Sequence, residues 1–193
     1  GWMGFYFRDE TGSTAWRADP QVEWRPTSFL ALSLGVGFEK MNEDTQWVDN
    51  IEGPSTTRYI FGRIRQTTIG LPVRVNYTIT PSLSVQIYAE PFVSAGAYGD
   101  FKDLVRPRAT PFASQFDAAG YAGNPDFNYR SFRSTNVLRW EFKPGSALYV
   151  VWQQGREDAS GTGRFRFRQD VGGLFGIPAS NVFLVKFSYW LNL

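Results

Sequence analysis

Hydrophobic and polar residues alternate with a period of two along most of the chain. The clearest run covers residues 69–79, in which every second position is apolar: Ile69, Leu71, Val73, Val75, Tyr77 and Ile79. Successive side chains of a β-strand point to opposite faces, so this pattern predicts strands with one apolar and one polar face. No run has the spacing of an amphipathic helix of three turns or more, and we expect an all-β protein.

Short segments that contain proline separate several of these runs, at residues 25–27, 80–82 and 143–146. Proline favours tight turns, and alternation continues on both sides of each segment, so we expect three β-hairpins. At their other ends the strands are joined by longer polar segments, at residues 99–128 and 155–180 and, over a shorter stretch, 49–55.

The pattern predicts about eight strands, near residues 2–8, 14–24, 28–47, 57–80, 83–98, 129–142, 146–154 and 181–193. An even number of strands, with short turns at one end and long loops at the other, is typical of bacterial outer-membrane barrels, whose short turns face the periplasm. Aromatic residues near the predicted turns and the terminus fit an interfacial girdle, although a β-rich core also favours aromatics. These residues are Trp24, Tyr77, Trp140, Phe142, Tyr189 and Trp190.

We therefore expect an all-β fold, an antiparallel transmembrane β-barrel in the bacterial outer membrane, with residues 1–193 as one domain. The mean hydropathy of −0.30 and the absence of a long apolar run argue against a spanning helix. They do not argue against a barrel, because its walls alternate apolar with polar residues.

Cysteine and histidine are both absent. Their absence excludes Ser-His-Asp and Cys-His triads and metal sites built on these residues, and we expect no enzyme activity. The net charge of +2, without a basic stripe, argues against nucleic acid as a partner. The acidic residues Glu39, Glu43, Asp44 and Asp49 lack the spacing of a calcium loop, and the glycine-rich segment 160–163 lacks the lysine of a phosphate loop. We expect no metal and no cofactor.

The last residues of the chain resemble the signal by which outer-membrane barrels are handed to the barrel-assembly machinery. The apolar positions that carry this likeness include Phe187, Tyr189, Leu191 and Leu193, the last being a leucine where phenylalanine or tryptophan is commoner.

A second, more specific resemblance rests on residues 65–68, 76–84, 90–96, 138–141 and 150–154. These segments are similar to a family of uncharacterised outer-membrane proteins in which a carbohydrate-binding family 9-like domain precedes a C-terminal barrel. The resemblance implies that the chain is the C-terminal portion of a longer polypeptide, with a larger barrel and a link to carbohydrate binding or uptake. It implies no particular activity.

Strand parity places a set of polar side chains on the face toward the barrel lumen: Arg74, Asn76, Gln86, Tyr88, Glu90, Arg139, Glu141 and Lys186, together with Arg17, Asp19, Glu23 and Glu39. These charges either pair across neighbouring strands to fill the interior or line a polar pathway for a solute. Glu90 and Glu141 are two carboxylates of the kind that a glycosidase needs about 5 to 10 Å apart, but no surrounding motif supports that role. The run 164–168 alternates arginine and phenylalanine and predicts a strand above the membrane, within reach of lipopolysaccharide phosphates or forming a solvated hairpin arm.

The function that we expect is a channel or transport component, or a surface anchor. Its partners would be outer-membrane lipid and lipopolysaccharide, the assembly machinery, and other outer-membrane subunits or a carbohydrate ligand. Two alternatives remain open at this point, a secreted β-sandwich or lectin-like binding module and a structural anchor without transport.

Overall fold

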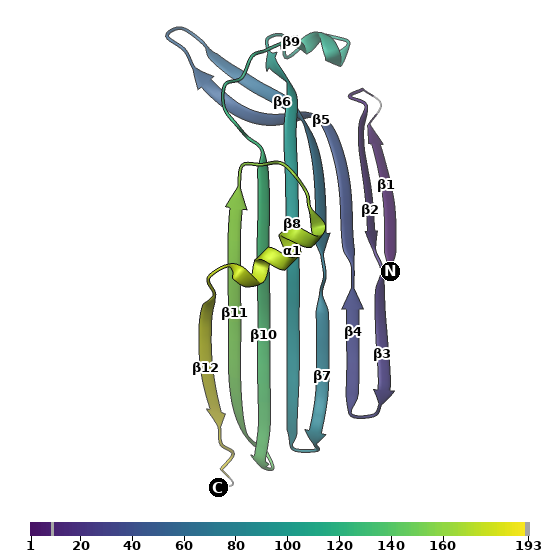
Figure 1. The fold of residues 1–193 in the computed structure, drawn as a ribbon, viewed down its shortest axis with the longest axis vertical. Helices are drawn as coiled ribbons and strands as arrows, with labels where there is room; N and C mark the ends of the chain where they lie inside the picture. The colour runs from purple at the N-terminus through teal and green to yellow at the C-terminus, as the bar shows by residue number, and fades with distance from the viewer. Residues whose placement is uncertain (9, 192–193) are drawn as a thin grey trace.

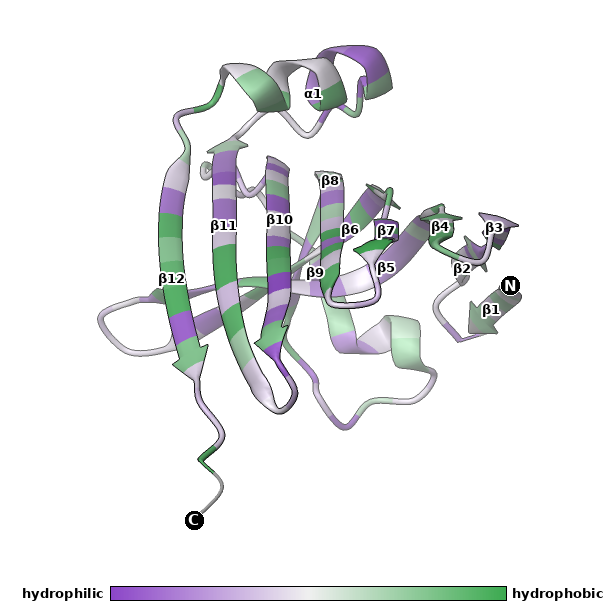
Figure 2. Cartoon of the chain, turned by 90° about the horizontal axis from the view of Figure 1, so that it is seen from below, coloured by the Kyte–Doolittle hydropathy of each residue, from purple (hydrophilic) through white to green (hydrophobic). Residues whose placement is uncertain are grey.

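The computed structural model describes residues 1–8 and 10–191, and it places nearly all of their regular structure in one antiparallel sheet (Figure 1). The strands are β1 (Trp2–Arg8), β2 (Ser13–Asp19), β3 (Gln21–Thr27), β4 (Leu30–Gly35), β5 (Gly37–Glu52), β6 (Thr57–Gly70), β7 (Val73–Thr80), β8 (Leu83–Leu104), β9 (Phe116–Ala118), β10 (Phe127–Lys143), β11 (Ser146–Ser160) and β12 (Ser180–Ser188). The predicted all-β antiparallel architecture is confirmed. Apolar and polar residues alternate visibly along the strands in Figure 2.

Three pairs of consecutive strands are halves of longer strands, namely β2 with β3, β4 with β5, and β6 with β7. Counting each interrupted strand once and leaving out the short β9, the sheet has eight long strands that pair in chain order. These eight correspond to the eight predicted from the alternation. The strands at 2–8 and 57–80 have the predicted outer limits, and most of the others extend further from the turns than expected.

The interruptions lie side by side, because prolines occupy neighbouring strands at the same level. The amide of Val36 donates to the Pro20 carbonyl at 2.9 Å, that of Gly35 to Pro72 at 2.8 Å and that of Leu71 to Pro91 at 2.9 Å. A proline nitrogen has no hydrogen to donate, so regular pairing is interrupted at this level from β2 and β3 across to one side of β8, whereas β8 itself continues through Pro91 and stays paired with β10. We call Pro20, Pro72 and Pro91 the proline line.

Two of the three predicted turns are found where expected, at residues 81–82 and 144–145. Gly145 has a φ of 77°, a left-handed conformation that glycine adopts without strain. The third turn is displaced from the predicted 25–27 to Ser28 and Phe29. Pro26 instead lies in β3, where the register shift between Trp24 and Thr27 accommodates its missing donor.

The long connections are shorter than predicted, covering residues 105–126 and 161–179, and both contain helical turns. The first holds η1 (Phe112–Gln115) and the second holds α1 (Phe167–Gly173) and η2 (Leu174–Gly176). The expectation of a strand at 164–168 is wrong. Residues 162–166 are irregular and α1 begins at Phe167, because β11 already pairs with β12 and offers no free edge to this run.

The segment 161–179 folds back onto one side of the sheet, and α1 stands off that side in Figure 2. Gly163, with a φ of 59°, turns the chain so closely past β8 that a Cβ at this position would lie 3.0 Å from the Ala97 Cα. Leu174 is fully buried, and Arg156 donates to the carbonyls of Phe175 and Ile177 at 2.9 and 2.5 Å. Long-range contacts therefore hold this segment in place.

The sheet is open in the described part of the chain. The strands β1 and β12 are its two edges and do not pair with each other. The sheet therefore does not close on itself as an eight-stranded barrel. The C-terminal strand ends at Ser188, before Tyr189 and Leu191 of the predicted assembly signal, and Leu193 lies outside the described residues. None of the described helices has the length and apolar character needed to cross a membrane.

Buried hydrophobic residues are few, and most lie in the half of the sheet away from the short turns. They include Ile60, Ile64, Val93, Ala95 and Leu174. The half nearest the turns contributes little to this core, because most of its large apolar side chains remain exposed on the sheet surface.

Candidate functional site

One face of the sheet near the short turns is apolar. The strand register places apolar residues of neighbouring strands side by side in two rows. We call these rows the apolar belt: Leu30, Tyr77, Val85, Leu138, Val150 and Val185 in one, and Trp24, Leu32, Val75, Ile87, Trp152 and Phe183 in the other. The second row is interrupted on β10, where Asn136 lies between Ile87 and Trp152. Trp24 is 61% exposed and Val185 is 70% exposed. All twelve of these residues are exposed or partly exposed.

The opposite face of the same strands is polar, and it holds the lumen-facing residues predicted from parity. Arg74 lies beside Tyr88, Asn76 beside Gln86, and Lys186 beside Tyr149, which in turn neighbours Arg139. Glu90 follows Tyr88, and Glu141 follows Arg139, at alternate positions of their strands. We call this surface the polar face.

Arg74, Tyr88 and Glu90 form the first cluster on the polar face, on β7 and β8. The Arg74 guanidinium lies 4.6 Å from the centre of the Tyr88 ring, and the Tyr88 hydroxyl donates to Glu90 Oε2 at 2.5 Å. Arg133 of β10 is the cross-strand neighbour of Glu90. A shallow cleft of about 210 Å³ opens here, between Glu90, Arg133 and Tyr129.

The second cluster lies on β10, β11 and β12, closer to the turns. Arg139 donates to Glu141 Oε2 at 2.6 Å and to the Tyr149 hydroxyl at 3.3 Å. The Lys186 ammonium lies 5.8 Å from the centre of the Tyr149 ring. Tyr149 was missing from the predicted set, although its position beside the alternating apolar residues Leu148 and Val150 would have placed it on the polar face.

The two clusters do not meet. Glu90 is opposite Arg133, and Glu141 lies eight positions further along β10, which corresponds to about 27 Å at roughly 3.4 Å per residue. This separation is too long for the two carboxylates of a glycosidase, which flank one bond at about 5 to 10 Å. Asn76 and Gln86 lie between the clusters and add uncharged hydrogen-bonding groups to the same face.

Comparison with known proteins identifies a family. The family model described as a domain of unknown function, DUF5916, matches residues 2–193. The chain belongs to the DUF5916 family. Neither the curated proteins nor the solved structures contain a match to it. For the DUF5916 chain the functional argument therefore rests on its own geometry.

A third polar cluster of the DUF5916 chain lies beyond the proline line, away from the turns. Asp44 accepts hydrogen bonds from Lys102 Nζ and Arg63 Nη2, both at 2.6 Å, and Arg63 also pairs with Asp100 at 2.9 Å. Burial alone would raise the pKa of the Asp44 carboxyl, but the hydrogen bonds from Lys102 and Arg63 outweigh it and lower this pKa. The pairing of Asp44 with two cations, and not with other carboxylates, makes this cluster a structural crosslink.

The aromatic residues near the turns form a cluster in the DUF5916 chain as well. Phe142 stacks on Phe187 with ring centres 5.4 Å apart and on Tyr189 at 6.4 Å, and Trp140 lies 5.9 Å from Phe142. Trp140 and Tyr189 are both about half exposed. Three of the predicted aromatic residues, Trp140, Phe142 and Tyr189, are therefore close neighbours, whereas Tyr77 lies beside Phe29.

Proposed function

We propose that this chain is the membrane-embedded part of an outer-membrane β-barrel, whose polar face lines the interior and whose apolar belt faces lipid. In this role the barrel is a channel or transport component, or the anchor of a surface domain. The observation that carries the proposal is the apolar belt, which lies on one face of the sheet near the short turns and consists of twelve exposed or partly exposed residues.

The apolar belt is larger than the apolar patches that soluble proteins usually expose to water. Four of the twelve belt side chains are aromatic, with about 150–250 Å² each, and together with the eight partly exposed aliphatic side chains they expose on the order of 1,000 Å² of apolar surface. The largest apolar patch of a typical soluble monomer is about 300–600 Å². Exposing so much apolar surface to water is unfavourable, and hydrocarbon next to the belt would replace that water.

The polar face supports the same arrangement. Barrels of the outer membrane alternate apolar residues toward lipid with polar residues toward the interior. Charges such as those of Arg74, Glu90, Arg139 and Glu141 are very costly in hydrocarbon, and here they lie on the side opposite the belt. The aromatic cluster of Trp140, Phe142, Phe187 and Tyr189 near the turns fits an interfacial girdle at one membrane surface.

The open edges favour a larger barrel than this chain alone forms. An unpaired backbone group in hydrocarbon costs several kcal/mol, so spanning sheets close completely. In the proposal, β1 and β12 therefore pair with further strands, either of the same polypeptide or of another subunit. A larger barrel agrees with the resemblance to a family in which the barrel follows a carbohydrate-binding domain, and that resemblance is also the ground for a link to carbohydrate uptake.

The rival function is a secreted β-sandwich that binds its ligand from water. A sandwich requires a second sheet packed on the apolar belt, about 10 Å away. All the described strands, however, belong to one sheet.

Extraction tests the proposal. Membranes of cells that express the full polypeptide are washed with carbonate and then treated with dodecyl maltoside, and the protein in each fraction is analysed by size-exclusion chromatography. We expect the protein to leave the membrane only with detergent and to elute as one species in its presence. A monodisperse protein in detergent-free buffer would refute the membrane role.

A further inference from the structure

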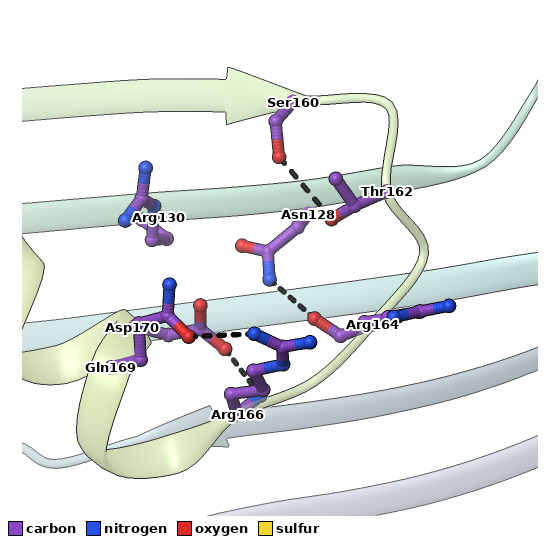
Figure 3. A pocket seen from close by; sticks show the side chains of 8 residues that line it. All are labelled: Asn128, Arg130, Ser160, Thr162, Arg164, Arg166, Gln169 and Asp170. Carbon is purple, nitrogen blue, oxygen red and sulfur yellow. Dashed lines mark hydrogen bonds between the residues drawn. The ribbon is translucent and has the colours of Figure 1, made fainter.

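A pocket of about 430 Å³ lies between the ends of β10 and β11 and the segment that follows β11 (Figure 3). Its lining includes Asn128, Arg130, Thr162, Arg164, Arg166 and Asp170. Three of these six side chains are arginines, and all of them lie within two sequence segments that the fold brings together.

The pocket is on the same side of the sheet as the apolar belt. Asn128 and Arg130 occupy alternate positions of β10 with Leu138, and the pairing of β10 with β11 has no register shift between these positions. Phe132 is the next residue of β10 on this face after Arg130, and it is opposite Pro91 of the proline line. The centre of its ring lies 5.5 Å from that of the exposed Phe175. The pocket therefore lies beyond the upper limit of the belt, immediately past this pair of aromatic rings.

Two buried polar atoms in the pocket lack partners among the described residues. Asn128 is 3% exposed, and its Nδ2 donates to the Arg164 carbonyl at 2.7 Å, which leaves Oδ1 as an unused acceptor. Arg130 pairs with Asp158 through Nη2, while its Nε is an unused donor. A buried polar group without a partner costs about 1–3 kcal/mol, so a ligand that supplies one acceptor and one donor is favoured here.

The charge of the pocket selects an anion. In Figure 3 the Arg166 guanidinium lies next to Asn128, on the side away from Arg130, and it donates to Gln169 Oε1 at 3.1 Å, whereas the guanidinium of Arg164 points away along the rim. The carboxylate of Asp170 is already bound to the backbone amide of Arg166 at 2.6 Å. Arginine binds phosphate oxygens through several parallel N–H donors, and Arg130 and Arg166 provide such donors from two sides.

We infer that this pocket binds the phosphate of a membrane-lipid headgroup, with a headgroup hydroxyl donating to Asn128 Oδ1. The inference rests on the proposed function, because it is the apolar belt that sets the membrane level. Phe132 and Phe175 lie between the pocket and the belt, the level at which acyl chains would meet headgroups. A lipid satisfies both requirements, since its phosphate accepts from Arg130 and Arg166 while its chains continue along the belt.

The test measures thermal unfolding of the full chain in dodecyl maltoside with added phosphatidylglycerol, which carries a phosphate and free hydroxyls. Parallel samples receive phosphatidylcholine, which has no headgroup hydroxyl, or inorganic phosphate. We expect phosphatidylglycerol to raise the Tm by several degrees, and phosphatidylcholine and inorganic phosphate to have little effect. A shift with inorganic phosphate as large as that with the lipid would refute the lipid as the ligand.

Two exposed substitutions probe the pocket without disturbing the core. Arg166→Gln removes the central cation and Thr162→Glu places a negative charge at the rim, and both should abolish the shift caused by phosphatidylglycerol. Arg168→Gln, two residues further on and outside the pocket lining, is the matched control and should keep it. An equal loss in Arg168→Gln would indicate general attraction to a basic surface and would overturn the inference.

The outcome for the pocket is separable from that for the membrane role. A protein that needs detergent but shows no shift with phosphatidylglycerol contradicts the pocket alone. A protein that is monodisperse in detergent-free buffer contradicts the proposed function, whatever the lipid measurement gives.

Discussion

At the scale of single residues, the strands near the short turns place their charges and their exposed apolar side chains on opposite faces. Val75 and Asn76 are adjacent in β7, yet Val75 lies in the apolar belt between Leu32 and Ile87 while Asn76 lies beside Gln86 on the polar face. One step along the strand therefore exchanges one environment for the other.

This adjacency gives a direct comparison of the two faces. In the proposed barrel an arginine at position 75 would face lipid, and we expect Val75→Arg to destabilise the folded protein by about 2–4 kcal/mol. Asn76→Arg adds the same side chain to the polar face and should cost much less. Urea unfolding in detergent or lipid vesicles measures both, and equal costs would contradict the assignment of the faces.

The Asp44 crosslink predicts a pH dependence. Because the pKa of Asp44 is lowered in the folded protein, its ion pairs contribute stability above the pKa of the unfolded chain, near pH 4. That contribution is lost as the pH falls through the lower, folded value. We expect the Tm difference between the native chain and Asp44→Asn to be largest at neutral pH and to shrink below about pH 4. A difference that stays constant from pH 7 to pH 3 would show that the carboxylate charge is not involved.

At the scale of elements, alternation was enough to predict the long strands but not what connects them. The eight long strands and two of the turns follow from parity and proline, because both act locally. The same alternation wrongly predicted a strand at 164–168, because the arginines and phenylalanines of this run have the period of a strand. Whether such a run pairs depends on a free neighbouring edge, which is a property of the whole sheet.

The candidate site was predictable to a similar extent. Parity placed Arg74, Glu90 and Arg139 on a common face, and the structure shows which of them touch. Parity could not show that Tyr149 lies between Arg139 and Lys186 and contacts both. It also could not show that Asp44 meets Lys102 across 58 positions of sequence. The pocket at Asn128 was also out of reach, because it depends on how the segment 161–179 folds back.

The docking of that segment depends on one buried side chain. Leu174 is fully buried and Phe175, the next residue, is 60% exposed. We expect Leu174→Ala to cost about 2–5 kcal/mol of the local packing energy and to release the segment. Limited proteolysis should then cleave within 161–179 much faster than in the native chain, whereas Phe175→Ala should change the rate far less. Unchanged cleavage in Leu174→Ala would mean that the hydrogen bonds of Arg156 suffice.

At the scale of the whole molecule, the role of the polar face depends on how the open sheet is closed by further strands. If further strands widen the structure into a large barrel, the clusters of Arg74 and Arg139 line a water-filled space. If the structure closes narrowly, the same charges pair across the interior and fill it.

Conductance distinguishes these two outcomes. Reconstituted into a planar bilayer, the full polypeptide is expected to pass ions, and Arg74→Glu should shift its selectivity toward cations while Glu90→Lys shifts it toward anions. A sealed bilayer under all voltages would contradict the channel and leave the surface anchor as the function.

The proline line limits how deeply such a sheet can be immersed. From Leu83, beside the turn, to Pro91 is eight steps of β8, or about 27 Å of strand at roughly 3.4 Å per residue. A barrel strand tilted by about 35–45° converts this length into about 20 Å of depth. A proline cannot donate to a carbonyl opposite it, and a carbonyl without a donor is more favourable in water than in hydrocarbon, so in the proposed barrel we expect the hydrocarbon to end near this level. In the proposed role, the positions of the prolines would therefore set the apolar height of the sheet, and that height suits a thin bilayer such as the bacterial outer membrane better than a thick one.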